Sequence, residues 1–559
     1  LDMKDPQDEA RLHRISDRVC DLVQRYGGVI WGEHGKGMRT AYSPRFFGPL
    51  WPELRRIKAA FDPHDQLNPG KIATATDDTP LVTIDAPTRG QRDRLIPARD
   101  REAYDVAIHC NGNGACFDYD PDHVMCPSAK ITRDRLHSPK GRAGVMREWL
   151  ARLAEANHPA SAEDTPGGWL TRARNTWRRE PDYSHQVYEA MHGCLSCKAC
   201  ATQCPIKVDV PTFKAEFLDR YHGRYLRPLR DHLIAALEST AALAARLPRL
   251  ATALAQLPPA RWLLARLGGI VDPPALSAPN ARARLAARDA PVADPEGIAA
   301  LPPAERARVV VLVPDAFTTF FDADALLAAY DLLAGLGYRP HVARFVPNGK
   351  GLHVKGFLRR FRRTVERAVA ALRPLAALDL PLIGVDPAVV LTWRDEYPHA
   401  LGLAPGGLGV HVRLIQEWLA EHTDAIRAAA QAHATDATDA TDATDATAPY
   451  LLMAHCTERT AAPAAEAQWR AAYAAAGLEL RPAAVGCCGM CGVYGHEADH
   501  VEESRGIYAM SWQKRLAGAT PARVVADGYS CRSQIKRCDG ITVRHPARAL
   551  ADALGLGPR

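Results

Sequence analysis

One stretch decides the fold class of this chain: CLSCKACATQCP, residues 194–205. Its cysteines stand at intervals that let one loop wrap around the irons of a cubane [4Fe–4S] cluster, and the last of them precedes Pro205. Structural zinc sites instead use two separated cysteine pairs. The stretch therefore predicts a helical, ferredoxin-type iron–sulfur domain. Its four ligand candidates are Cys194, Cys197, Cys200 and Cys204.

An incomplete copy of this pattern lies upstream. Cys110 and Cys116 are as far apart as the first and third cysteines of the later stretch, but Asn113 stands between them, and Cys126 is followed by proline. In two-cluster modules the cysteine before proline serves the other cluster. Crossed ligation would pair Cys126 with Cys194, Cys197 and Cys200.

That pairing leaves Cys110, Cys116 and Cys204 as three ligands for a second centre. The alternatives are a three-iron cluster, an iron that also binds water or asparagine, and no second cluster. The spacing of the cysteines does not decide between them.

The C-terminal part of the chain carries another set of cysteines. Cys487 and Cys488 are adjacent and precede a glycine, and a disulfide between neighbours would close a strained ring. Thiolates beside a glycine suit a cluster or another metal. We expect Cys456 and Cys531 to complete this site, because both follow apolar strands. Cys491 is a fifth candidate, whereas Cys20 and Cys538 are interpreted as ordinary thiols.

The sequence predicts a multidomain chain of α/β units and α-helical domains. A strand–helix–strand pattern begins at Val309 and again at Tyr450, which indicates a duplicated α/β unit whose first copy has no cysteines. An Ala-Thr-Asp repeat separates the copies. We expect seven segments. They are an N-terminal segment (1–75), a linker (76–103), the iron–sulfur domain (104–225), a helical connector (226–303), the first α/β unit (304–425), the repeat linker (426–449) and the cysteine-bearing unit (450–559).

Composition excludes several classes of protein. The 559 residues carry a net charge of +6, which is too dilute for nucleic-acid binding. No apolar run is long enough to span a membrane, and residues 1–14 are not a signal peptide. The connector is basic and amphipathic, so it either packs between domains, which we favour, or contacts a membrane surface.

Glu33 and His34 lie between glycines after a predicted short strand, and glycines allow such a turn to approach a ligand. The motif WGEHGKG, residues 31–37, and the later NPGK, residues 68–71, resemble the C-terminal end of FAD-linked oxidases of the vanillyl-alcohol oxidase type. Residues 194–205 resemble the iron–sulfur subunits of glycolate oxidase and anaerobic glycerol-3-phosphate dehydrogenase. The later cysteines resemble the cysteine-rich CCG domain. Their order, with HSPKGRA at residues 137–143, is similar to that of fused FAD- and iron–sulfur-containing D-2-hydroxyglutarate or D-lactate dehydrogenases.

The resemblance implies an oxidoreductase that oxidises a D-2-hydroxy acid at FAD and passes electrons through [4Fe–4S] clusters to a quinone or another carrier. Glu33 would bind a divalent metal together with histidines outside this chain, and His34 would contact the substrate or act as its base. Asn68 and Lys71 would lie near the flavin. The rival interpretations are a stand-alone electron-carrier subunit, a heterodisulfide-reductase-like protein and a zinc-stabilised scaffold.

The family's main FAD-binding domain has no counterpart here, so we expect the chain to be the C-terminal part of the fused enzyme. A cytoplasmic location, with peripheral contact at the inner face of the membrane, and a homo-oligomer are further expectations from the resemblance.

Overall fold

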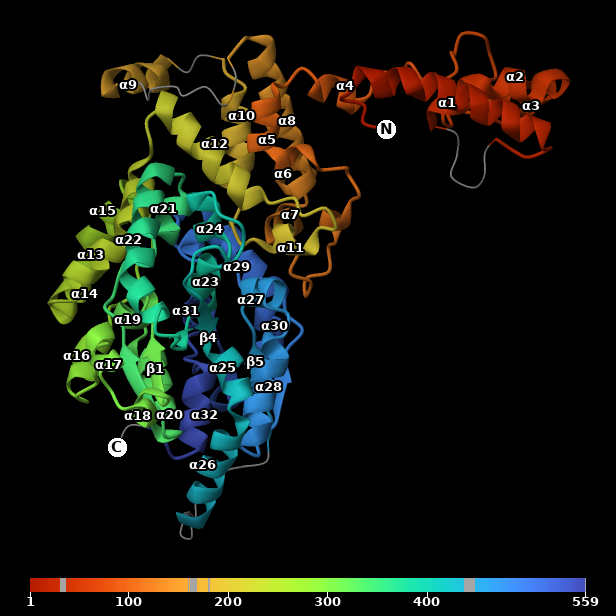
Figure 1. Cartoon of the computed structure of the whole chain (residues 1–559). Coiled ribbons are helices and arrows are strands. Elements are labelled where there is room, and N and C mark those ends of the chain that lie inside the picture. Colours follow the sequence, from red (N-terminus) through yellow and green to blue (C-terminus); the bar gives the residue numbers. More distant parts are fainter. Residues whose placement is uncertain (31–36, 159, 161–167, 179–180, 437–447, 558–559) are drawn as a thin grey trace. The chain divides into compact units, whose positions relative to one another are not determined.

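The computed structural model describes residues 1–30, 37–158, 160, 168–178, 181–436 and 448–557. The chain divides into two compact units (Figure 1). Unit 1 comprises Leu1–Ile108 and Arg147–Ala162, and unit 2 comprises His109–Met146 and Glu163–Arg559. Both sets of clustered cysteines belong to unit 2.

Unit 1 is helical. Asp5 caps its first helix by accepting a hydrogen bond from the Gln7 backbone N–H. Val29 and Ile30, predicted to lie in a strand, are not in one. The helices before the iron–sulfur domain are α1 (Pro6–Arg25), α2 (Ser43–Phe47), α3 (Trp51–Phe61), α4 (Arg89–Asp93), α5 (Ala98–Ala103) and α6 (Asp105–Ile108).

The predicted linker 76–103 is wrong in part, because its second half is helical and packed. Ile96 is fully buried, and Asp93 of α4 forms a buried ion pair with Arg147 of α8 (Pro139–Glu155). The many charged residues suggested a solvated segment, but several of these charges are paired inside unit 1.

Unit 2 begins with the helices that surround residues 194–205 and continues into the connector. Its helices up to residue 306 are α7 (Pro127–Thr132), α9 (Trp169–Arg178), α10 (Ser184–His192), α11 (Ala199–Gln203), α12 (Val210–Arg224), α13 (Leu229–Ala244), α14 (Pro248–Gln256), α15 (Pro258–Arg266), α16 (Ala281–Ala286), α17 (Pro295–Ala299) and α18 (Pro303–Arg306).

Two parallel sheets follow. The first has the order β2-β1-β3-β4, from β1 (Val309–Leu312), β2 (Arg339–Val342), β3 (Leu382–Gly384) and β4 (Val412–Leu414). The second has the order β6-β5-β7, from β5 (Tyr450–Met453), β6 (Leu480–Pro482) and β7 (Val524–Ala526). The first three strands of each sheet therefore share one spatial order. Duplication of the unit stays a prediction, which this order supports.

One apolar core joins the inner faces of the two sheets. It includes Leu312 of β1 and Leu452 of β5, and helices lie between the sheets (Figure 1). These helices are α20 (Ala323–Gly335), α25 (Ile415–Glu421), α28 (Ala465–Ala475) and α32 (Pro546–Ala553). Because both sheets contribute to a single core, the two α/β units are held as one body.

Helix α26 (Thr423–Asp436) extends into the predicted linker 426–449. The alanine-rich start of that segment favours helix. The part of the repeat at 437–447 lies outside the described residues.

Candidate functional site: two adjacent cysteine centres

Cys126, Cys194, Cys197 and Cys200 line one small cavity in unit 2. Cys126 precedes α7, and the other three lie on the loop from α10 into α11. The backbone is left-handed at Cys126, Ser196 and Lys198, with φ of 33°, 58° and 63°. Such conformations are costly for residues other than glycine and are typical of functional loops. The structure thus brings together the four residues of the predicted crossed set.

Two buried cations, Arg142 in the cavity wall and Lys214 on the Cys194 backbone, donate a hydrogen bond to no carboxylate among the described residues. Arg142 is 1% exposed, and its guanidinium donates to the Ala190 carbonyl, to Ser128 Oγ and, over 3.8 Å, to Cys126 Sγ. Lys214 Nζ donates to the Cys194 carbonyl over 2.6 Å, and burial lowers the pKa of Lys214. A buried cation is costly unless negative charge compensates it. A thiolate-ligated cluster would supply that charge.

The other three cysteines of the domain are also buried. Cys116 lies near Cys110, and burial raises the pKa of Cys116. Cys204 follows α11. The structure does not decide between the alternatives for a second cluster here.

The C-terminal cysteines lie at the carboxyl ends of three parallel strands. Cys456 begins α27 (Cys456–Ala461) after β5, Cys487 and Cys488 follow β6, and Cys531 lies on α31 (Tyr529–Asp539) after β7. A chain of thiol contacts joins them from Cys456 through Cys487 and Cys488 to Cys531. These contacts hold the pKa of Cys488 well below its usual value, because its thiolate accepts from both neighbours.

The spacing of the sulfurs bears on the kind of metal. Within the part of the chain that the structure describes, no three cysteine sulfurs lie within 4.8 Å of one another. Metal–sulfur bonds of about 2.3 Å would place the sulfurs of a tetrahedral zinc site about 3.8 Å apart. The wider arrangement fits a centre of several metal ions better than one ion.

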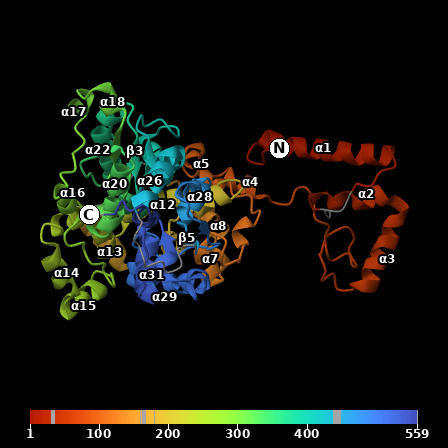
Figure 2. The same cartoon turned by 90° about the horizontal axis from the view of Figure 1, so that it is seen from below.

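The two centres are neighbours. Thr457 Oγ1 donates to the Cys197 carbonyl over 3.2 Å, although 260 residues separate the two. Cys197 packs against an apolar cluster that contains Cys456 and Cys487, and Cys491 joins it. Burial raises the pKa of Cys197, and the nearby Cys456 raises it further. Helices α7 and α29 (Val501–Met510) pack beside this contact (Figure 2). Sequence reasoning missed the contact, since nothing local marks it.

A further group with metal-ligand side chains is His192, Glu497 and His500. Lys355 Nζ lies 2.8 and 2.9 Å from the two carboxylate oxygens of Glu497, and Arg230 donates to His192 Nε2 over 2.8 Å. Two cations therefore already occupy the ligand atoms. We assign this group to an ion-pair network that joins the connector to the C-terminal unit.

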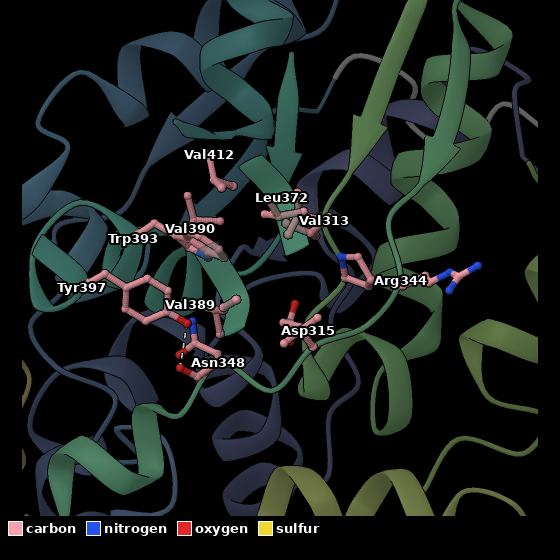
Figure 3. Close-up of a pocket in the computed structure, with 15 residues that line it drawn as sticks. Val313, Asp315, Arg344, Asn348, Leu372, Val389, Val390, Trp393, Tyr397 and Val412 are labelled. Carbon is pink, nitrogen blue, oxygen red and sulfur yellow. Dashed lines mark hydrogen bonds between the residues drawn. The ribbon is translucent and has the colours of Figure 1, made fainter. Parts of the chain in front are cut away.

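The first α/β unit has a cavity at the carboxyl edge of its sheet (Figure 3). No cysteine lines it; its walls include Val313, Val390 and Trp393. Both side-chain amide atoms of the buried Asn348 lack a partner among the described residues. Burial, with the Asp386 carboxylate nearby, raises the pKa of Asp315 to about 7.

In unit 1, Glu33 and His34 lie outside the described residues. Asn68 has a left-handed φ of 50°, and its carbonyl accepts from the Lys71 N–H in a tight turn. Asp62 accepts from the backbone N–H groups of Gln66 and Leu67. Hydrogen bonds within residues 62–71 therefore stabilise the turn that carries Asn68 and Lys71.

Two protein-family models match the chain. Residues 1–72 match the FAD-linked oxidase C-terminal domain, and residues 106–208 match a 4Fe–4S dicluster domain. D-2-hydroxyglutarate dehydrogenases of Pantoea ananatis and Escherichia coli are each 46% identical over 99% of the chain.

The chain is a homologue of D-2-hydroxyglutarate dehydrogenases. It spans about half the length of these relatives, 54% in both cases. One subunit of the anaerobic glycerol-3-phosphate dehydrogenase of E. coli is 24% identical over 37% of the chain and 49% of its own length. No solved structure shows a significant match. The predicted resemblance to D-2-hydroxyglutarate dehydrogenases, with an FAD-linked oxidase segment and a 4Fe–4S domain, is confirmed.

Proposed function

We propose that the chain is the electron-transfer portion of a flavin-dependent D-2-hydroxy acid dehydrogenase. A D-2-hydroxy acid of the 2-hydroxyglutarate, lactate or glycolate class is oxidised at FAD. The electrons then pass through the centre at Cys126, Cys194, Cys197 and Cys200 to the centre at Cys456, Cys487, Cys488 and Cys531. A quinone or another carrier receives them.

The contact between Thr457 and Cys197 carries this proposal. Iron–sulfur clusters accept and release single electrons, and the protein tunes their potentials through charge, hydrogen bonds and burial. Two centres that pack against one apolar cluster would form a relay through the protein. Arg142 and Lys214 offset the negative charge of the first centre and so favour its reduced state.

In this proposal the N-terminal segment binds the substrate and takes part in its oxidation. His34 takes the hydroxyl or α-proton, Glu33 holds a divalent metal, and Asn68 and Lys71 lie near the flavin. The names of the relatives, D-2-hydroxyglutarate dehydrogenases, support 2-hydroxyglutarate as the substrate. FAD, when bound, would accept the two electrons of the oxidation, as a hydride from the α-carbon where His34 takes the hydroxyl proton.

A stand-alone electron carrier is the second candidate function. The similarity to one subunit of anaerobic glycerol-3-phosphate dehydrogenase, which extends over 37% of the chain, favours this function. The FAD-linked oxidase match at residues 1–72 is the observation against it, because an electron carrier has no need of that segment.

The dicluster match supports a second cluster at Cys110, Cys116 and Cys204.

The relay is tested on anaerobically purified protein by iron and acid-labile sulfide analysis and by electron paramagnetic resonance after reduction. Two adjacent reduced centres broaden each other's signals. Cys197→Ser should remove the centre at Cys126, Cys194, Cys197 and Cys200 and leave a narrow signal from the centre at Cys456, Cys487, Cys488 and Cys531. Cys20→Ser, in unit 1, should change neither signal. Stoichiometric zinc without acid-labile sulfide would contradict the proposal.

A further inference from the structure

The end of the connector exposes an unusual number of large apolar side chains. Trp262 is 65% exposed and Leu247 is 64% exposed, and neither α14 nor α15 contains a buried residue. This leucine–arginine surface comprises Leu243, Leu247, Leu250, Leu254, Leu257, Trp262, Leu263 and Leu267 with Arg246, Arg249, Arg261 and Arg266. Figure 1 shows α13, α14 and α15 along one edge of the α/β units.

These helices are fixed in place by their other contacts. Ala241 and Ala245 pack against Phe320 in a small buried cluster. Asn280 Nδ2 donates to the Ala245 carbonyl over 2.8 Å, and the Leu276 N–H donates to Thr252 Oγ1 over 3.1 Å. The apolar side chains therefore point outward from an anchored structure. Packing between domains, which the sequence favoured, does not cover them within the described residues.

The charge on this surface has one sign. Between Glu238 and Asp272 the chain carries four arginines and no acidic residue. The side chains of Arg246, Arg249 and Arg266 make no hydrogen bond or ion pair with any described residue, whereas the Arg261 side chain lies 3.3 Å from the Asp272 carboxylate. Unpaired arginines beside exposed leucines are complementary to a surface that is negatively charged outside and apolar beneath.

We propose that the leucine–arginine surface docks on an anionic lipid bilayer. Amphipathic helices lie in the bilayer interface with leucine and tryptophan among the acyl chains and basic residues at the headgroups. Each arginine near an anionic membrane adds about 1 kcal/mol. No helix within the described residues is long and apolar enough to cross a membrane, so the contact is peripheral. The proposal rests on these residues alone and goes beyond the proposed relay.

The test is flotation of the whole chain with vesicles of phosphatidylglycerol and phosphatidylcholine, and with phosphatidylcholine alone. Binding should require the anionic lipid and weaken with salt. The combined change Leu250→Gln, Leu254→Gln and Trp262→Gln should weaken binding roughly tenfold or more, because it removes three apolar side chains from the membrane. Arg246→Gln with Arg249→Gln should weaken it by roughly tenfold or more.

Leu403→Gln is the matched control, because Leu403 is exposed elsewhere on unit 2. It should bind like the unchanged chain, and circular dichroism should show all variants folded. Equal binding of the unchanged chain and the triple variant, or no binding to anionic vesicles, would overturn the proposal. So would a change of oligomeric state in the triple variant without lipid, since the surface would then be an interface between copies of the chain.

Discussion

At the scale of single residues, buried charge distinguishes the two α/β units. Asp315 caps α19 (Ala316–Phe320) by accepting from the Phe317 and Thr318 N–H groups, yet it lies deep beside Asp386. The second unit places His455 and Cys456 after its own first strand. The carboxyl edge of the first sheet therefore carries acids and no cysteine, whereas that of the second carries thiols together with the buried Asp527.

Asp315 predicts a pH dependence of stability. Its pKa is about 7 in the folded protein, against about 4 in an unfolded chain. The folded state therefore binds more protons between these values, and the free energy of unfolding falls as pH rises through this range. Asp315→Asn keeps the cap and removes the titration, so it should stabilise the protein at pH 8 relative to pH 4 by about 3–4 kcal/mol.

Urea unfolding of the variant and the unchanged protein at the two pH values measures this difference. Asp294→Asn is the control, because Asp294 caps α17 at an exposed position. An Asp315→Asn effect that is the same at both pH values would show that the pKa of Asp315 does not change on folding, which would contradict this prediction.

At the scale of elements, the first strands of the two α/β units were predictable, the strand expected at Val29 was not found, and the site was predictable only in its parts. Residues 450–453 form a strand as expected, because the run is short and apolar. The cysteine spacing within 194–205 predicts one loop. The contact of Thr457 with Cys197 could not be predicted, since it depends on how two distant elements pack. The buried role of Arg142 has no local signal either.

The C-terminal centre gives a prediction at this scale. Cys488 contacts both Cys487 and Cys531, so Cys488→Ser should remove this centre's metal. The cavity lined by Cys126 and Cys194 lies on other elements and should keep its cluster. Iron and sulfide content, with the visible spectrum, measures the loss. Cys538→Ser is the control, because Cys538 lies on α31 outside the contact chain; a loss of all iron in Cys488→Ser would contradict two separate centres.

The contact of α4 with α8 gives a second prediction. Asp93 accepts from Arg147 Nε over 3.1 Å in a buried pair, and burial lowers the pKa of Arg147 to about 10. Asp93→Asn removes the carboxylate charge of this buried ion pair and should destabilise unit 1 by about 3–5 kcal/mol. Arg92→Gln breaks the exposed pair with Glu148 and should cost less than about 1 kcal/mol. Denaturant unfolding compares the two variants. Equal effects on the free energy of unfolding would mean that burial of the Asp93–Arg147 pair does not increase the cost of breaking it.

At the scale of the whole molecule, the two units should respond differently to loss of iron. All clustered cysteines lie in unit 2, and a bound group stabilises only the unit that binds it. Scanning calorimetry before and after anaerobic removal of iron should show a lower transition temperature for unit 2 and an unchanged one for unit 1. Asp93→Asn identifies the transition of unit 1. A single transition that shifts as a whole would contradict this independence.

The packing of α7 on α29 also has a consequence for how the protein is made. All four cysteines of the cavity at Cys126 leave the ribosome before residues 450–559 are synthesised. Ile507 and Tyr494 belong to the apolar cluster that later covers Cys197, and Tyr494 lies over the Cys194 loop, with its hydroxyl 3.5 Å from the Gly193 carbonyl. Assembly factors therefore reach the first centre most easily while synthesis continues. Docking of residues 450–559 then blocks this access. A cluster lost from the mature protein would therefore be hard to replace.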